Sequence, residues 1–208
     1  MKVVVATKNR GKLTELRALL SGARVGGRLL ELVGVDQAGV LLPDVEETGS
    51  TYIANALLKA RAIAAKTGLA TLADDSGLEV DVLDGAPGVH SARYAGDAGP
   101  SANTHKLLRV MERHEERTAR FRCVIVFLAS PSAEPLCVEG VCEGAIAHIA
   151  RGASGFGYDP VFEVAQAELA LLGLRAPHTM SELGDDEKNL ISHRGRAVRA
   201  LRAALDVR

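Results

Sequence analysis

Two adjacent carboxylates stand directly after a strand-length apolar run in this chain. Asp74 and Asp75 follow Leu69–Ala73 and precede a small, flexible pair of residues. The pattern predicts a strand that ends at the acids, a turn, and a second strand over Leu78–Val82. Because neighbouring strand residues point to opposite faces, the two acids can converge only where the strand ends. Such a pair could hold a hard cation beside a ligand, although an ordinary polar turn has the same composition.

A polar, basic loop follows the first predicted strand, Val3–Ala6, and leads into a helix over Lys12–Leu20. The unpaired N–H groups and the positive dipole end at the start of a helix attract anions. Hydroxyl, amide and cationic groups come from Thr7, Lys8, Asn9, Arg10, Gly11 and Lys12. We expect this loop to bind a phosphate chain, although its spacing is not that of a Walker A motif and an ordinary capped helix would look similar.

A second acidic segment precedes another predicted helix, which runs to about Thr67. Ser50 or Thr51 can cap the start of this helix, and Gly68 is a natural stop. Either Glu46 or Glu47 could join the aspartates around Mg²⁺, which prefers oxygen ligands and bridges phosphates. Within the helix, Asn55 and Lys59 are four residues apart and therefore share a face. Acids before a helix are also favoured by its dipole, so this segment has a purely structural alternative.

Two further segments have the composition of a nucleoside site. An aromatic ring between glycines can stack on a base, and the later segment supplies a point charge and a planar donor fork. The residues are Phe156, Gly157, Tyr158 and Asp159 in the first segment and Lys188, His193 and Arg194 in the second. Each segment alone fits a core-covering turn or a solvated helix pair. Together with the acids and the basic loop, they indicate a nucleoside triphosphate site.

The elements that position these groups alternate between strand and helix patterns, which is typical of an α/β fold. The remaining predicted strands are Phe121–Ala129, Leu136–Ile149, Val161–Val164 and, earlier in the chain, Leu30–Val35. The first two of these strands read as a hairpin with one solvated face. The remaining predicted helices are Ser101–Glu115, Gln166–Leu174, Asp185–Ile191 and Arg194–Leu205. The sequence has no internal repeat and no low-complexity linker, so we expect one domain over residues 1–208.

The composition is that of a globular protein, with 47% hydrophobic residues and a formal net charge of −1. Without an overall positive charge, we expect no nucleic-acid partner. No apolar run approaches the roughly 20 residues of a membrane span. The start of the chain also lacks the apolar core, about 7–15 residues long, of a signal peptide. We therefore expect a cytoplasmic protein with no membrane partner.

Six motifs in a fixed order resemble those of one enzyme family. They are Thr7–Lys12, Glu46–Gly49, Ala73–Leu78, Gly85–Tyr94, Gly155–Pro160 and Ser192–Gly195. From Val3 to about Leu201, the chain resembles the inosine triphosphate pyrophosphatase family. This resemblance implies a two-lobed α/β fold around a long mixed β-sheet flanked by helices, with the active site in the cleft between the lobes. It also implies a homodimer that requires Mg²⁺ and hydrolyses ITP, dITP and XTP to the nucleoside monophosphate and pyrophosphate, cleansing the nucleotide pool.

The resemblance also assigns roles to residues of this chain. Asp75 is expected to be the catalytic base and a metal ligand, with Glu46, or alternatively Glu47, as a second ligand and Asp74 in support. The phosphate and substrate contacts are expected from Thr7–Lys12, Lys59, Ser76 and Lys188, and the nucleoside pocket from Phe156–Asp159 with His193 and Arg194. The chain departs from the family pattern at Lys8, where glycine is common, and in a longer stretch over Ala165–His178.

Selectivity is expected from the two donors near the C-terminus. Hypoxanthine and xanthine present a 6-keto acceptor to His193 and Arg194, whereas adenine presents an amino donor that would remain unpaired. The sequence does not identify what excludes the 2-amino group of guanine. Two other classes remain as alternatives: a pyrophosphatase for pyrimidine nucleotides and a non-catalytic nucleotide sensor. Intact acids at Glu46, Asp74 and Asp75 argue against the sensor.

Overall fold

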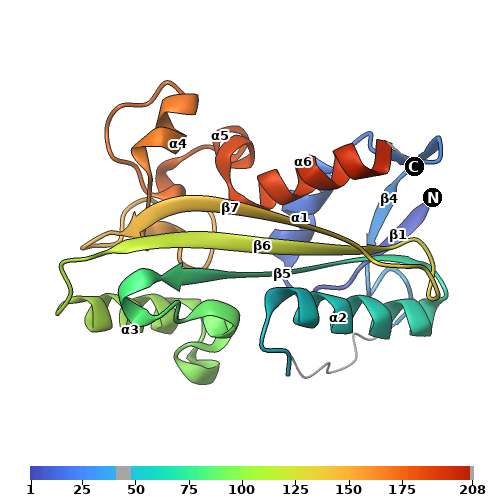
Figure 1. The fold of residues 1–208 in the computed structure, drawn as a ribbon, viewed down its shortest axis with the longest axis horizontal. Coiled ribbons are helices and arrows are strands. Elements are labelled where there is room, and N and C mark those ends of the chain that lie inside the picture. Colours follow the sequence, from blue (N-terminus) through green and yellow to red (C-terminus); the bar gives the residue numbers. More distant parts are fainter. Residues whose placement is uncertain (41–47, 207–208) are drawn as a thin grey trace. The chain divides into compact units, whose positions relative to one another are not determined.

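The computed structural model describes residues 1–40 and 48–206 and has the predicted α/β architecture, with a mixed sheet flanked by helices (Figure 1). The strand order in the main sheet is β4-β1-β5-β6-β7-β8. These strands are β1 (Lys2–Val5), β4 (Glu31–Gly34), β5 (Ala70–Val80), β6 (Thr118–Leu128), β7 (Leu136–Ile146) and β8 (Phe162–Val164). Strand β1 is parallel to both β4 and β5, whereas β7 is antiparallel to β8.

Local sequence signals place the helix ends. The helices are α1 (Arg10–Leu19), α2 (Tyr52–Thr67), α3 (Pro100–Met111), α4 (Gln166–Leu171), α5 (Asp185–Ile191) and α6 (His193–Asp206). The Thr51 hydroxyl accepts a hydrogen bond from the Ala54 N–H at the start of α2, and Gly68 ends that helix in the left-handed conformation. Helices α3 and α4 end earlier than predicted. A short hairpin of β2 (Arg24–Val25) and β3 (Arg28–Leu29) was not predicted.

The predicted turn at the two aspartates is wrong, because no turn interrupts the chain there, and the predicted solvated face is wrong for β6, which is buried on both faces from Cys123 to Leu128. Strand β5 runs without a break from Ala70 to Val80, through Asp74 and Asp75. Pairing with neighbouring strands therefore overrides the local preference of aspartate and glycine for turns, because β propensity is weaker than its tertiary context. The two acids consequently lie within a strand and not at its end.

The chain forms two compact units of discontinuous segments. The first unit comprises Met1–Asp75, Cys123–Gly140 and Arg196–Arg208, and the second comprises Ser76–Arg122 and Val141–Gly195. Each unit has its own hydrophobic core. The unit boundary in β5 falls between Asp75 and Ser76, so the predicted site residues divide between the units at this point.

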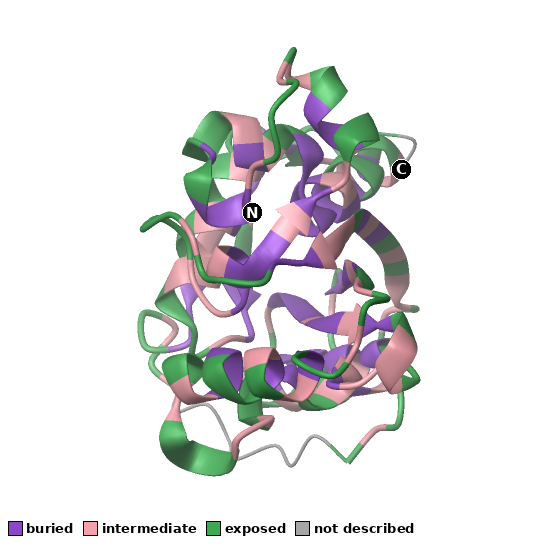
Figure 2. Ribbon diagram, turned by 90° about the vertical axis from the view of Figure 1, so that its left-hand side faces the viewer, coloured by how far each residue is buried: buried purple, intermediate pink, exposed green. Residues whose placement is uncertain are grey.

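The core of the first unit has two layers, one on each face of β1. Val3 and Val5 pack with apolar residues of α1 and α6, whereas Val4 and Ala6 pack with residues of α2. Figure 1 accordingly shows α2 on one side of these strands and α1 with α6 on the other. Strand β1 is exposed at Lys2 and buried from Val3 to Val5. Burial on both faces explains its uninterrupted apolar sequence. In Figure 2 the helices carry both buried and exposed residues, as expected of amphipathic helices that cover a sheet.

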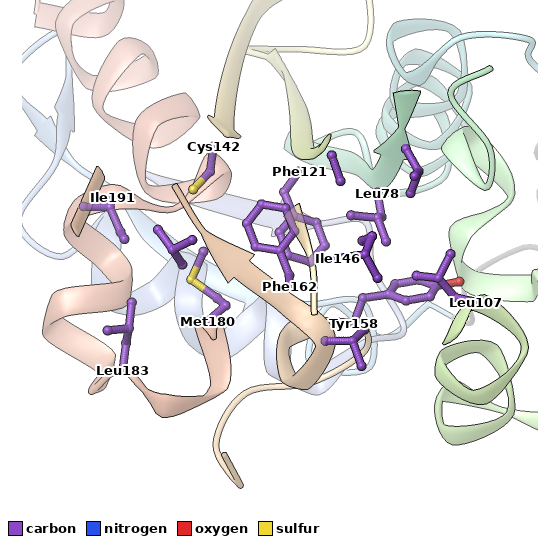
Figure 3. Close-up of a cluster of buried hydrophobic side chains, with 14 of the residues drawn as sticks. Leu78, Leu107, Phe121, Cys142, Ile146, Tyr158, Phe162, Met180, Leu183 and Ile191 are labelled. Carbon is purple, nitrogen blue, oxygen red and sulfur yellow. The ribbon is translucent and has the colours of Figure 1, made fainter. Parts of the chain in front are cut away.

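The core of the second unit is built around an aromatic pair. The Phe121 and Phe162 rings have centroids 4.3 Å apart, and Leu78, Leu107 and Tyr158 belong to the same cluster (Figure 3). The longer stretch over Ala165–His178 covers this core: Leu169 is fully buried, and Leu172 and Leu174 pack against the cluster. Its remaining leucine, Leu171, is 64% exposed.

Candidate active site

The two aspartates of β5 point to opposite faces of the strand. Asp74 lies on the face that α1 covers, where its carboxylate is 3.0 Å from the Lys12 ammonium group. Asp75 lies on the face that α2 covers, where its carboxylate is 2.9 Å from the Lys59 ammonium group. Both carboxylates are almost completely buried, and each is paired with a cation as burial requires. Each acid thus has its own lysine from a different helix.

Helix α2 holds Asp75 from two positions on one face, as the four-residue spacing predicted. Lys59 donates both to the Asp75 carboxylate and to the Asp74 carbonyl, each at 2.9 Å. The Asn55 amide nitrogen lies 3.4 Å from the other Asp75 carboxylate oxygen, and the Asn55 side-chain oxygen accepts the Gly49 N–H at 2.8 Å. Asn55 therefore connects Asp75 to the segment that leads into α2.

The basic loop is arranged around the start of α1. Asn9 caps this helix by accepting the Lys12 N–H, and the Thr7 hydroxyl accepts the Asn9 N–H at 3.1 Å. The side chains of Lys8 and Arg10 are exposed, whereas that of Lys12 is only 16% exposed. The helix start presents N–H groups, the neighbouring cations add charge, and together they form a suitable anion site.

The acids of the first unit suit a magnesium ion in part. Asp75 offers carboxylate oxygens, the ligand type that Mg²⁺ prefers, and its present cation contact could be exchanged for a metal. Asp74 turns its carboxylate to the other face of β5. Glu46 and Glu47 lie outside the described residues. Over residues 1–40 and 48–206, no group of three or more His, Cys, Asp or Glu side chains could hold a metal.

The predicted nucleoside residues lie in the second unit, where Asp159 organises the loop that carries Phe156. One Asp159 carboxylate oxygen accepts the Phe156 N–H and the Lys188 ammonium group, both at 2.9 Å. A side chain at Gly155, whose φ is +78°, would lie 2.2 Å from this oxygen, so only glycine fits there. The Lys188 nitrogen also lies 4.9 Å from the centre of the Phe156 ring. The Asp159 carboxylate therefore joins the loop backbone at Phe156 to the Lys188 ammonium group.

Arg194 and His193 enter the second unit from the start of α6. The Arg194 side chain is fully buried, its guanidinium donates to the Ser76 hydroxyl at 3.1 Å, and it lies 5.7 Å from the Phe156 ring centre. The His193 ring stacks on Phe121 with centroids 4.8 Å apart. The Arg194 guanidinium beside the Phe156 ring combines a donor fork with a stacking surface, which is suited to a keto-purine.

Tyr158 has a different environment from its neighbours in the loop. Its ring lies in the core of the second unit, and its hydroxyl donates to the Ser91 carbonyl at 2.9 Å. The Tyr158 hydroxyl is protonated at neutral pH, as tyrosine ordinarily is, and burial raises its pKa further above the usual value. The side chain of Tyr158 therefore shapes the loop from within the core.

Sequence reasoning missed two polar residues of α3 that contact this region. Asn103 forms hydrogen bonds with the backbone of residues 91, 92 and 95, and the Thr104 hydroxyl lies 3.3 Å from the Gly157 carbonyl. Both side chains are buried. The sequence contained one signal for them: both lie on the apolar side of a predicted helix. Polar side chains buried there require hydrogen-bond partners.

None of the helices within residues 1–40 and 48–206 has both the length and the apolar composition to cross a bilayer.

Comparison with known proteins gives consistent matches along nearly the whole chain. The model of the Ham1 family matches residues 3–204. A dITP/XTP pyrophosphatase of Thioalkalivibrio sulfidiphilus is 47% identical, covering 97% of this chain and 96% of that protein. A dITP/XTP pyrophosphatase of Bacillus licheniformis is 44% identical, covering 99% and 98%. The solved structure of a HAM1 protein from Coxiella burnetii has a TM-score of 0.84 and 40% identity, and the match covers 100% of both chains.

Proposed function

The chain belongs to the Ham1 family, and we propose that it hydrolyses non-canonical purine nucleoside triphosphates, dITP and XTP among them, to the nucleoside monophosphate and pyrophosphate. The observation that carries this proposal is the buried Asp75 carboxylate, held by Lys59 and Asn55, in a chain similar over 97% of its length to a dITP/XTP pyrophosphatase. A carboxylate fixed beside cations is suited to phosphoryl chemistry, in which positioning and charge stabilisation dominate.

In the proposed reaction, water attacks the α-phosphorus and Asp75 accepts its proton. The new bond joins the water oxygen to phosphorus, and the bond between the α-phosphorus and the bridging oxygen breaks, so that pyrophosphate leaves. A free aspartate is a weak base with a pKa of about 3.9, so its contribution depends on position. Lys12 and the N–H groups at the start of α1 stabilise the phosphate charge.

We propose Mg²⁺ as the cofactor, held by Asp75 and by Glu46, with Glu47 as the alternative. Two observations support this cofactor. Asp75 offers carboxylate oxygens, the ligand type that Mg²⁺ prefers. The Gly49 N–H, which follows these glutamates in the sequence, donates to Asn55, and Asn55 also contacts Asp75. When bound, the ion supplies charge neutralisation of the triphosphate and lowers the pKa of water.

Base selectivity is proposed to come from the second unit. Arg194 and His193 donate to the 6-keto oxygen of hypoxanthine or xanthine, and Phe156 stacks on the base. Adenine presents a donor at the same position, and an unpaired buried donor costs roughly 1–3 kcal/mol. The support is the burial of Arg194 and its position beside the Phe156 ring.

The test is product identity across a substrate panel. Purified protein is assayed with Mg²⁺ against XTP, dITP, ITP, GTP, ATP and a pyrimidine triphosphate, with separate detection of pyrophosphate and orthophosphate. Pyrophosphate from XTP, dITP and ITP, lost with EDTA and restored by Mg²⁺, is the expected result. Orthophosphate as the first product, or preference for a pyrimidine, contradicts the proposal.

Two further properties are proposed, and both were expected at the level of the sequence. We propose that the protein is a homodimer and that it acts in the cytoplasm. Light scattering coupled to size-exclusion chromatography tests the first, and fractionation of the source cells tests the second.

A further inference from the structure

A buried hydrogen-bond network in the second unit lies outside the residues that contact substrate in the proposed function. It is centred on Ser91, whose carbonyl accepts the Tyr158 hydroxyl at 2.9 Å and the Asn103 amide at 3.3 Å. The Ser91 hydroxyl donates to the Gly88 carbonyl at 2.6 Å and accepts the Leu78 N–H at 2.9 Å. Ser91, Asn103 and Tyr158 are each at most 7% exposed. The network thus joins β5, α3 and the loop that carries Phe156.

The contacts close into a circuit around the Phe156 ring. Arg194 lies beside this ring and donates to Ser76. Ser76 and Leu78 are two residues apart on β5 and therefore face the same side of the strand. From Leu78, the circuit continues through Ser91 to Tyr158, which is two residues after Phe156 in the loop. The ring and the guanidinium are therefore fixed to the same stretch of β5 by separate routes.

Asn103 holds the backbone around Ser91 in place. Its amide nitrogen donates to the carbonyls of Ser91 and Ala92, and its side-chain oxygen accepts the Ala95 N–H at 2.6 Å. One buried side chain thus satisfies three backbone groups of a segment rich in glycine and 3-10 turns. Because leaving such groups unsatisfied is unfavourable, the segment has little freedom to move away from Tyr158.

We infer that Ser91, Asn103 and Tyr158 are positioning residues for the purine, which set the distance between the Phe156 ring and Arg194 without touching the substrate. This inference rests on the proposed function, since it concerns how that substrate's base is held. The Tyr158 hydroxyl acts on the loop and not on the phosphates, so its loss weakens base binding and leaves the chemical step unchanged.

The experiment compares Tyr158→Phe and Ser91→Ala with the wild type and with Tyr94→Phe. The Tyr94→Phe variant is the matched control, because it removes a tyrosine hydroxyl close to Ser91 in the sequence. No hydrogen bond of the Tyr94 hydroxyl is seen among the described residues. Steady-state kinetics with XTP are combined with product inhibition by XMP and by pyrophosphate, at a temperature well below thermal unfolding of every variant.

We expect Tyr158→Phe and Ser91→Ala to raise KM for XTP and the inhibition constant of XMP by about 3- to 10-fold, the size expected for one buried hydrogen bond. The kcat values and the inhibition constant of pyrophosphate change less than about twofold. Tyr94→Phe behaves as the wild type. A merely structural role lowers the melting temperature of the first two variants without separating XMP from pyrophosphate.

Each contrary outcome has a distinct meaning. If Tyr158→Phe and Ser91→Ala match Tyr94→Phe in all kinetic constants, or weaken XMP and pyrophosphate equally, the positioning role is overturned while the proposed function stands. If the wild type releases no pyrophosphate from XTP or dITP, the proposed function fails, and the inference that depends on it fails as well.

Discussion

The two units of this protein hold their polar groups in different ways. In the first unit, the Asp74 carboxylate is paired with Lys12 at 3.0 Å and the Asp75 carboxylate with Lys59 at 2.9 Å. In the second, a planar guanidinium at Arg194 and an aromatic ring at Phe156 are held by a hydrogen-bonded framework. An ammonium group is a mobile point charge, whereas a guanidinium has a fixed donor geometry.

This difference indicates a division of labour between charge and shape. Ion pairs with lysine can be exchanged when a phosphate or metal arrives, because the lysine stem is flexible and its contact is not directional. The framework of the second unit permits little adjustment, which suits discrimination between a keto and an amino group. Variants in the first unit and variants in the second unit should therefore change different kinetic constants.

The largest effect is expected from Asp75→Asn. The amide keeps the size of the side chain but cannot accept the proton of the attacking water, so kcat falls by about 10²- to 10⁴-fold. Inhibition by XMP changes little, because the second unit is untouched. Asp81→Asn, which alters a more exposed carboxylate paired with Arg120, is the control and keeps full activity. Near-normal turnover of Asp75→Asn would remove this residue from the catalytic role.

A smaller effect is expected from Arg194→Lys, and it concerns selectivity. Lysine keeps the charge but loses the planar fork, so the ratio of kcat/KM for XTP to that for ATP falls by roughly 10- to 100-fold. Arg199→Lys, an exposed position on the same helix α6, is the control. If the ratio stays constant in Arg194→Lys, the discrimination comes from another residue and the contrast between the units weakens.

The smallest kinetic effect is expected from Lys12→Met, which removes one cation near the start of α1. This change also removes the cation paired with the buried Asp74 carboxylate, so the melting temperature falls as well. KM for XTP and the inhibition constant of pyrophosphate rise by about 3- to 10-fold, since one charged contact to phosphate is lost in a partly solvated setting. The XTP-to-ATP ratio is unchanged, in contrast to Arg194→Lys. Lys66→Met, at an exposed site in α2, is the control. A change in base preference would contradict the division between the units.

The sequence by itself determined the local features of the fold. The cap at Thr51 and the stop at Gly68 bound α2 as predicted, because these signals act within a few residues. The four-residue spacing of Asn55 and Lys59 likewise predicted that they share one face of the helix, and both contact Asp75 in the structure. The sequence also grouped the acidic, basic and aromatic residues of the expected site into short segments, but it did not divide them between two units.

Only the tertiary structure decided how these groups face one another. A turn was predicted at the aspartates, but strand pairing keeps β5 continuous, and alternation then sends Asp74 and Asp75 to lysines on different helices. The link between Tyr158 and Ser91 spans 67 residues of sequence and leaves no local pattern. Local signals reflect the energetics of a few neighbouring residues, whereas sheet pairing and buried polar contacts depend on segments that meet only after folding.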